Sequence, residues 1–298
     1  MKIARDIRTA ACFLMAFLAF GCAAMGADYG TGNAVLAGEV LPAGRVKALA
    51  VTAASQLIGG HRHEGLVGDF KMYNSRVGFV ISGARASSGM DPYGGMVEEA
   101  GLLRKEGGAY RWRNLLGDFY YAFYHGSDPL ANGRLFQAKK AWIVKDGTDG
   151  TAIIRIEGSD AEFPTRRELF LRPSKPMGVL ITVDYILRPD SMSLEMKVSI
   201  RNTGDKAKNI SFGQLFLMGD GAPLFMPGCG FDMTCFRNTK TALIAAPGDG
   251  VSYGWFSPGV TMESMDQLEN LMIVEIGKIK APAGGDGSFT TWFTVAPG

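Results

Sequence analysis

The three histidines are the side chains of this sequence best suited to proton transfer or metal binding near neutral pH, where an unperturbed imidazole titrates. His61 and His63 alternate in a polar stretch bounded by glycines. In an extended backbone both imidazoles would point to one side, where they could bind a metal ion together with Glu64 or Asp69. A histidine pair without an assigned third ligand is weak evidence for a metal, and a solvated loop is the simpler interpretation.

His125 ends a stretch rich in aromatic residues. Aromatic side chains with a polar group at their edge hold sugar rings, by apolar contact with the ring face and by hydrogen bonds around it. The predicted ligand-binding residues are His125, Tyr121, Tyr124, Trp112 and Asp91. The competing interpretation is that these aromatic rings fill the core of a β-sandwich and that His125 is satisfied at its edge.

An acid–base enzyme would need His125 beside a carboxylate. The acidic residues that could serve are Glu98 and Asp220, and also Asp91, Glu99 and Asp118. Glu98 and Glu99 are adjacent, and successive residues of a strand point to opposite faces, so a solvated surface position is the default interpretation for them. No nucleophile motif or nucleotide-binding glycine motif occurs, so the sequence indicates no cofactor and favours a protein that is not an enzyme.

The N-terminus is typical of an export signal. Lys2, Arg5 and Arg8 precede an apolar run at residues 10–21, which is shorter than the roughly 20 residues that span a bilayer. We expect residues 1–26 to be a signal peptide cleaved before Ala27. The alternative is a lipobox that ends at Cys22, which would then carry the lipid. Either route predicts export, to the periplasm, to the outer membrane as a lipoprotein, or to the medium.

Cys229 and Cys235 are the cysteines that remain after signal processing, if Cys22 is lipidated or removed. In an oxidising compartment their spacing suits a disulfide that closes a short loop. Two free buried thiols are an alternative. A metal site is the weakest interpretation, because tetrahedral zinc needs four ligands and no histidine lies nearby in the sequence.

Composition excludes two broad classes of protein. The chain has 298 residues, of which 47% are hydrophobic, with 31 Lys and Arg against 29 Asp and Glu. An intrinsically disordered protein has fewer apolar residues and a larger net charge. A nucleic-acid-binding protein needs an excess of positive charge, so we expect no nucleic-acid partner.

Alternation of apolar and polar residues is the main structural signal. In residues 193–202 the apolar side chains point one way and the polar ones the other, as in a strand with one wet face. We predict strands at residues 77–82, 141–145, 152–158, 167–171, 178–187, 193–202, 210–217, 243–246, 251–256, 272–277 and 289–295. Residues 46–58 fit a helix or a strand, and residues 262–271 suggest a short helix.

These patterns predict an all-β, mainly antiparallel fold with few short helices. So many strands do not form one open twisted sheet, so a large two-layer supersandwich is expected. Residues 27–45 are rich in glycine and small side chains and are expected to be a flexible lead-in. Residues 46–298 show no internal break and are expected to form a single domain.

Five segments in order, residues 73–81, 92–95, 185–205, 227–231 and 251–254, resemble the N-terminal β-rich module of large exported bacterial proteins. That module in turn is similar to the supersandwich of galactose mutarotase-like domains. The resemblance covers residues 46–298 and implies a fold. It implies no activity, because the histidine-containing motifs of mutarotases are missing.

The preferred hypothesis is therefore an exported or lipid-anchored β-sandwich with a binding or scaffolding role. Its expected partner is a polysaccharide or another component of the cell envelope, and membrane contact is expected only through a lipid on Cys22. One alternative is a carbohydrate-active enzyme, epimerase-like or lyase-like, that uses His125 and a carboxylate. Another is the N-terminal module of a longer protein.

Overall fold

The computed structural model describes residues 31–35, 39–60, 63–86, 92–124, 133–162, 175–218, 223–232, 235, 240–258, 262–268 and 271–298. In these ranges the chain forms strands and one short 3-10 helix, η2 (Ala54–Gln56), which confirms the all-β prediction. The strands are β1 (Thr31–Ala34), β2 (Val46–Ala50), β3 (Phe70–Asn74), β4 (Val77–Ile81), β5 (Val97–Glu106), β6 (Ala109–Arg113), β7 (Leu116–Tyr124), β8 (Arg134–Asp146), β9 (Ala152–Glu162), β10 (Val179–Leu187), β11 (Ser193–Asn202), β12 (Lys208–Met218), β13 (Lys240–Thr241), β14 (Leu243–Ala246), β15 (Ser252–Phe256), β16 (Met262–Leu268), β17 (Leu271–Ala281) and β18 (Asp286–Ala296).

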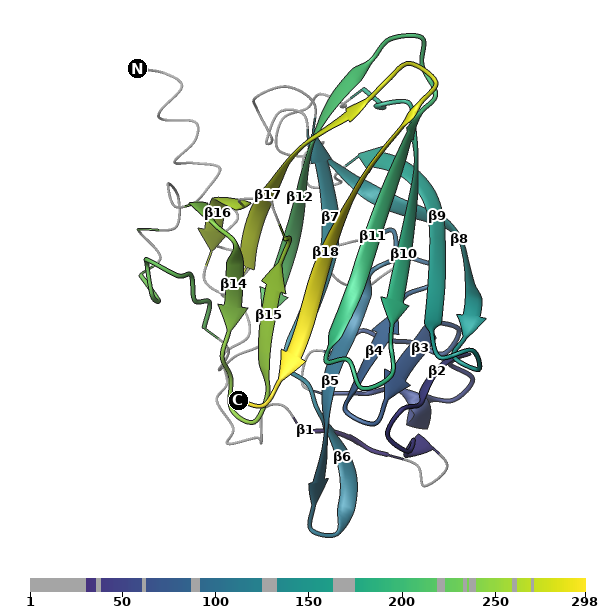
Figure 1. Ribbon diagram of the computed structural model, residues 1–298, viewed down its shortest axis with the longest axis vertical. Helices are drawn as coiled ribbons and strands as arrows, with labels where there is room; N and C mark the ends of the chain where they lie inside the picture. Colours follow the sequence, from purple (N-terminus) through teal and green to yellow (C-terminus); the bar gives the residue numbers. More distant parts are fainter. Residues whose placement is uncertain are drawn as a thin grey trace.

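Antiparallel pairing links these strands into a continuous sheet that folds into two layers (Figure 1). The first layer runs β8–β9–β10–β11–β18–β15–β14. The second runs β2–β3–β4–β5–β7–β12–β17–β16. A short pairing of β7 with β8 joins the two layers, as the supersandwich prediction requires.

The strands of the first layer follow the alternation seen in the sequence. In β11 the side chains of Leu194, Met196, Val198 and Ile200 are fully buried, while Lys197 between them is exposed. Each buried side chain removes apolar area from water, and this is the main stabilising term of such a sheet. The predicted strands within the described ranges lie inside observed strands or match them to within one residue.

Aromatic rings from both layers form the core between them. Phe119 of β7 stacks on Phe293 of β18 with ring centroids 5.3 Å apart. Phe293 also lies within 6.4 Å of Phe79 and within 6.3 Å of Phe216, both in the second layer. On its other side it stacks on Tyr253 at 5.6 Å. Phe293 therefore contacts both layers and is central to the sandwich.

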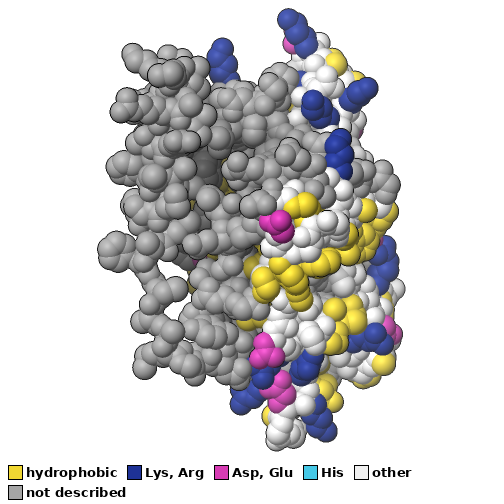
Figure 2. Space-filling model, turned by 90° about the vertical axis from the view of Figure 1, so that its left-hand side faces the viewer, with side chains coloured by type: hydrophobic (Ala, Val, Ile, Leu, Met, Phe, Trp, Pro, Cys, Tyr) yellow, Lys and Arg dark blue, Asp and Glu magenta, His cyan; other side chains and the backbone are white. Residues whose placement is uncertain are grey.

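Two hairpins, β11–β12 and β17–β18, form the upper end of the molecule in Figure 1. Backbone hydrogen bonds join them directly, from Asn202 to Gly285 (3.0 Å) and from Gly284 to Gly204 (3.2 Å). Figure 2 shows Lys and Arg side chains gathered at this end. The hairpins therefore act as one structural unit at the tip of the sandwich.

Four expectations about local structure are corrected, made more specific, or lie outside the described residues. Residues 262–271 were expected to form a helix, but β16 occupies most of them, because pairing with β13 and β17 overrides the weak helical pattern. Residues 46–58 form β2 followed by η2. Within the expected flexible lead-in, β1 pairs with β6. The strand predicted at residues 167–171 lies outside the described residues.

Replacing Phe293 with alanine should lower the free energy of unfolding by about 3–5 kcal/mol, because it leaves a cavity between the layers. Leu180→Ala is the matched control, since Leu180 is 53% exposed on the first layer and its loss should change stability by no more than about 0.5 kcal/mol. Urea unfolding followed by tryptophan fluorescence measures both values. Equal effects of the two substitutions would contradict the assignment of Phe293 to the centre of the core.

Candidate functional site

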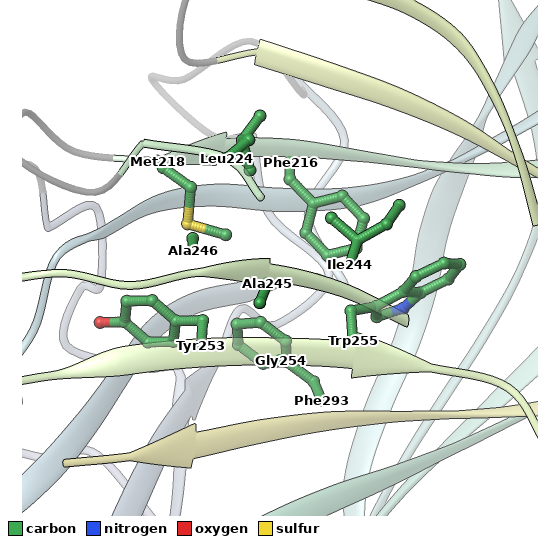
Figure 3. Close-up of a pocket in the computed structure, with 10 residues that line it drawn as sticks. All are labelled: Phe216, Met218, Leu224, Ile244, Ala245, Ala246, Tyr253, Gly254, Trp255 and Phe293. Carbon is green, nitrogen blue, oxygen red and sulfur yellow. The ribbon is translucent and has the colours of Figure 1, made fainter. Parts of the chain in front are cut away.

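A small apolar cavity lies in the sandwich between β12, β14, β15 and β18, but it is unsuited to a ligand (Figure 3). Phe216, Met218, Ile244, Tyr253 and Trp255 are among its lining residues. Its space of about 10 Å³ is at the lower limit for one water molecule. The cavity is a packing gap in the core, and the candidate functional side chains lie elsewhere in the molecule.

The structure places two of the predicted ligand-binding residues in the core. Trp112 and Tyr121 are 1% and 0% exposed. The Tyr121 ring lies among Phe119, Phe136 and Phe212, with centroids 5.7–6.4 Å away. Tyr121 packs in the core of the sandwich, as the competing interpretation held. Trp112 lies in a separate buried cluster with Val51, Ile58 and Val80, between the sheet and the connection that follows β2.

Several other predicted positions lie outside the described part of the chain. They are Cys22, His61, Asp91, His125 and Asp220, and the side chains of Asp118 and Tyr124. Their proposed roles remain predictions. Cys229 and Cys235 form a disulfide with their Cα atoms 5.6 Å apart.

Glu98 and Glu99 are not solvated as expected, because they are 1% and 0% exposed. The cause is a β-bulge: Val80 of β4 pairs with Glu99 and Ile81 pairs with Val97, so Glu98 is an extra residue. A bulge redirects side chains and breaks the simple alternation from which opposite faces were inferred. Both carboxylates are thereby buried at the start of β5.

Asp69 lies at the same end of the sheet, because it precedes Phe70, and Phe70 and Val97 both pair with Ile81. It forms an ion pair with Arg85. The guanidinium donates to both oxygens of the fully buried Asp69, at 2.7 Å each. Two backbone amides complete the set of donors, from Gly83 (3.0 Å) and Leu66 (2.8 Å).

The Arg85 guanidinium reaches a second acidic side chain as well. Its Nη2 lies 3.5 Å from Glu98 Oε1. The side chain of Arg85 is 20% exposed, whereas Asp69 and Glu98 are at most 1% exposed. The cation is therefore the part of this group that faces water.

Glu99 holds the segment that connects β2 with β3, of which the structure describes residues 51–60 and 63–69. Its Oε2 accepts hydrogen bonds from the amides of Ile58 (2.7 Å) and Gly59 (2.9 Å). Gly59 has φ +75°, a conformation that glycine adopts without strain. The segment crosses the outer face of the second layer at this point, and its own residues Leu57 and Ile58 are buried. The carboxylate thus fixes both the path and the depth of the segment.

His63 lies on this segment and returns to the same carboxylate. Its Nδ1 is 3.5 Å from Glu99 Oε1, an oxygen that makes no hydrogen bond within the described residues. A Cβ atom at Gly65 would lie 2.4 Å from Oε1, so only glycine leaves room there. The Glu99 carboxylate beside it raises the pKa of His63 above its usual value. The imidazole is 46% exposed and the Glu99 side chain is buried, so the imidazole is the part of this pair that contacts solvent.

A buried lysine supports the segment from below. Lys71 Nζ forms an ion pair with Glu39 (3.0 Å) and donates to the carbonyl of Gln56 (2.6 Å). It also lies 5.1 and 5.2 Å from the ring centroids of Tyr73 and Trp112. Burial lowers the pKa of Lys71. The lysine anchors η2 and the lead-in to the sheet, which gives residues 51–69 a rigid base.

We call His63, Asp69, Arg85, Glu98 and Glu99 the Glu99 cluster. It combines donors that face water with acceptors that are buried and held in place. A carboxylate-oriented imidazole of this kind can transfer a proton or donate a charge-assisted hydrogen bond. No group of three metal-ligating side chains occurs among the described residues. The predicted metal ligands His63 and Asp69 bind Glu99 and Arg85 instead.

Comparisons with known proteins give similar folds only. No protein-family model and no curated protein matches the sequence. The Slr1438 protein from Synechocystis sp. PCC 6803 has 11% identity and a TM-score of 0.47, over 81% of this chain and 99% of that one. The galactose mutarotase related enzyme from Lactobacillus acidophilus has 10% identity and a TM-score of 0.38, over 76% of this chain and 97% of that one.

An alpha-galactosidase from Geobacillus stearothermophilus has 13% identity and a TM-score of 0.41, over 77% of this chain and 40% of that chain. Solved structures with a similar fold thus include a protein of the mutarotase-like class, which the sequence motifs resemble. At these scores they supply no argument about activity or site. The described residues contain no helix of the length and apolarity needed to cross a bilayer.

Replacing Glu99 with glutamine should lower the pKa of His63, because the carboxylate is the main cause of its elevation. Histidine NMR titration measures the pKa directly. Glu64→Gln is the matched control and should have a smaller effect, since Glu64 contributes only a weaker charge interaction. An unchanged His63 pKa in the Glu99→Gln variant would contradict the pairing.

The same pairing predicts a pH dependence of stability. A pKa raised in the folded state means that protonated His63 stabilises the fold below its unfolded pKa, near 6.5. This contribution is lost as the pH rises through the raised folded-state pKa. His63→Asn should therefore be less stable than the wild type at pH 5.5 and equally stable at pH 9, as measured by urea unfolding.

Proposed function

We propose that this chain is an exported protein that binds carbohydrate at the Glu99 cluster. The observation that carries the proposal is the half-exposed His63 imidazole, whose Nδ1 lies 3.5 Å from the buried Glu99 carboxylate. Arg85, whose side chain is 20% exposed, donates to the carbonyl of Glu64 (3.0 Å) and so brings a second cation to the residue that follows His63. Sites for small ligands place a few polar groups in a defined geometry among apolar side chains.

Sugar hydroxyls accept hydrogen bonds as well as donate them. The Glu99 cluster offers imidazole and guanidinium donors, while its carboxylates are at most 1% exposed and hold these donors in place. Charge-assisted hydrogen bonds of this type are stronger than those between neutral groups. Leu66 and Val67 are 49% and 56% exposed on the same segment as His63. They offer apolar contact for the face of a sugar ring.

Export is supported by two independent features. Lys2, Arg5 and Arg8 precede the apolar run that is typical of a signal peptide. Cys229 and Cys235 form a disulfide, and disulfides persist in oxidising compartments outside the cytosol. Both features fit a periplasmic, lipid-anchored or secreted protein whose partner is a polysaccharide or another component of the cell envelope.

A second candidate function is proton transfer on a sugar, as in an epimerase-like or lyase-like enzyme. The contact between His63 Nδ1 and Glu99 favours it, because a histidine oriented by a carboxylate is a suitable general acid or base. This assigns to His63 the role that the sequence suggested for His125. The carboxylate that completes the pair is then Glu99.

The binding function is tested with a glycan array of neutral and acidic polysaccharides, followed by calorimetry on the glycan retained. His63→Ala should weaken binding by about tenfold, the loss expected when one charge-assisted hydrogen bond is removed. Glu157→Gln is the control, because Glu157 is exposed on the first layer. Failure of the wild type to retain any glycan, or full affinity in His63→Ala, would contradict the proposal.

The enzymatic alternative has its own measurement. Freshly dissolved α-anomers of free aldoses are followed by proton NMR with and without the protein. Faster interconversion that is lost in both His63→Ala and Glu99→Gln supports proton transfer at this pair. Binding of glycan without acceleration leaves the protein as a binding module.

A further inference from the structure

The tip formed by the two hairpins carries a concentration of positive charge that the Glu99 cluster does not use. We define the tip as residues 201–209 and 278–286. Its cations are Arg201, Lys206, Lys208, Lys278 and Lys280, and its acidic residues are Asp205 and Asp286. The whole chain has 31 basic and 29 acidic residues, so the excess at the tip is a local feature. It is visible at the top of Figure 2.

Four of the five cations of the tip are exposed, and the fifth, Lys208, is half-buried and donates to the carbonyl of Gly178 (3.0 Å). Arg201, Lys206, Lys278 and Lys280 are exposed. No ion pair joins any of the five cations to a carboxylate within the described residues. Elsewhere on the sandwich the structure does pair exposed charges, as between Lys145 and Asp149 (2.6 Å). Asp286 lies opposite Arg201 across β11 and β18, and five cations against two carboxylates leave the tip with a net charge of +3.

A buried amide makes the tip rigid. Asn202 is fully buried, and its side-chain NH₂ donates to the carbonyls of Lys206 (2.7 Å), Ala281 (3.2 Å) and Pro282 (3.0 Å). Its Oδ1 accepts from the amide of Gly204 (3.0 Å). One side chain thus ties both hairpins together, and the lysines project from a framework that is ordered before any partner binds.

The cations surround the tip. Arg201 lies on β11 of the first layer, whereas Lys278 and Lys280 lie on β17 of the second, and Lys206 is in the β11–β12 turn. A surface that meets the tip end-on would come within reach of all of them. The tip contains no aromatic residue on which a sugar ring could stack. A broad anionic plane therefore fits this shape better than a glycan chain does.

We propose that the tip binds the anionic headgroup surface of a lipid bilayer. Each basic residue close to such a surface strengthens binding by about fivefold, and the attraction extends over about one Debye length, roughly 8 Å at physiological salt. The exposed residues Ala207, Pro282 and Ala283 are small, so contact is electrostatic and reversible. This docking is independent of the proposed sugar site and of a lipid on Cys22.

Vesicle co-sedimentation tests the proposal, with phosphatidylcholine vesicles that contain or lack phosphatidylglycerol. The protein is purified after export as a Cys22→Ser form, which cannot be lipidated. We expect binding that requires phosphatidylglycerol and weakens with salt. The triple variant Lys206→Glu, Lys278→Glu, Lys280→Glu should lower this affinity by about tenfold or more.

The matched control reverses the same number of exposed charges at the other end of the molecule, Arg45→Glu, Lys47→Glu and Lys105→Glu. It should keep most of the binding. Equal losses in the two variants, or no difference between the two vesicle types, would overturn the proposal. So would binding to soluble alginate without binding to vesicles, which would identify a glycan as the partner. Circular dichroism of both variants verifies that they are folded.

Discussion

A carboxylate can be buried only if hydrogen bonds or a cation replace the water that it loses. Three carboxylates, Asp69, Glu98 and Glu99, are buried at one end of β3, β4 and β5. Their partners come from Arg85 and from backbone amides of residues 51–69 and 83. This requirement determines where the β2–β3 connection lies, and hence where His63 faces water.

The sandwich supplies a rigid base for these contacts. Stacked rings such as Phe119 and Phe293 join the two layers, so the strands that carry the carboxylates cannot move apart without losing a large buried apolar area. At the other end of the sandwich, Asn202 of β11 orders the hairpins of the tip. One scaffold therefore holds two polar surfaces, the Glu99 cluster and the basic tip, at separate places. A protein docked by its tip would keep the Glu99 cluster away from the membrane.

The sequence predicted the strands of the first layer because one of their faces is wet and the alternation is visible, as in residues 193–202. It did not predict β5, since residues 51–69 cover the outer face of that strand and a bulge interrupts its period. His63 was recognised as chemically suitable, but its partner was not. Its contact with Glu99 depends on a connection that crosses the sheet and on hydrogen bonds between residues 41 positions apart in the sequence, which no local pattern encodes.

The central claim is that Glu99 fixes the segment that presents His63. Hydrogen exchange at the amides of Ile58 and Gly59 tests it most directly, because both donate to the Glu99 carboxylate. The account predicts that these amides exchange slowly in the wild type, although they belong to a connection, and rapidly in a Glu99→Ala variant whose β10 and β11 amides remain protected. Rapid exchange of both amides in the wild type, or equal protection in the variant, would contradict it.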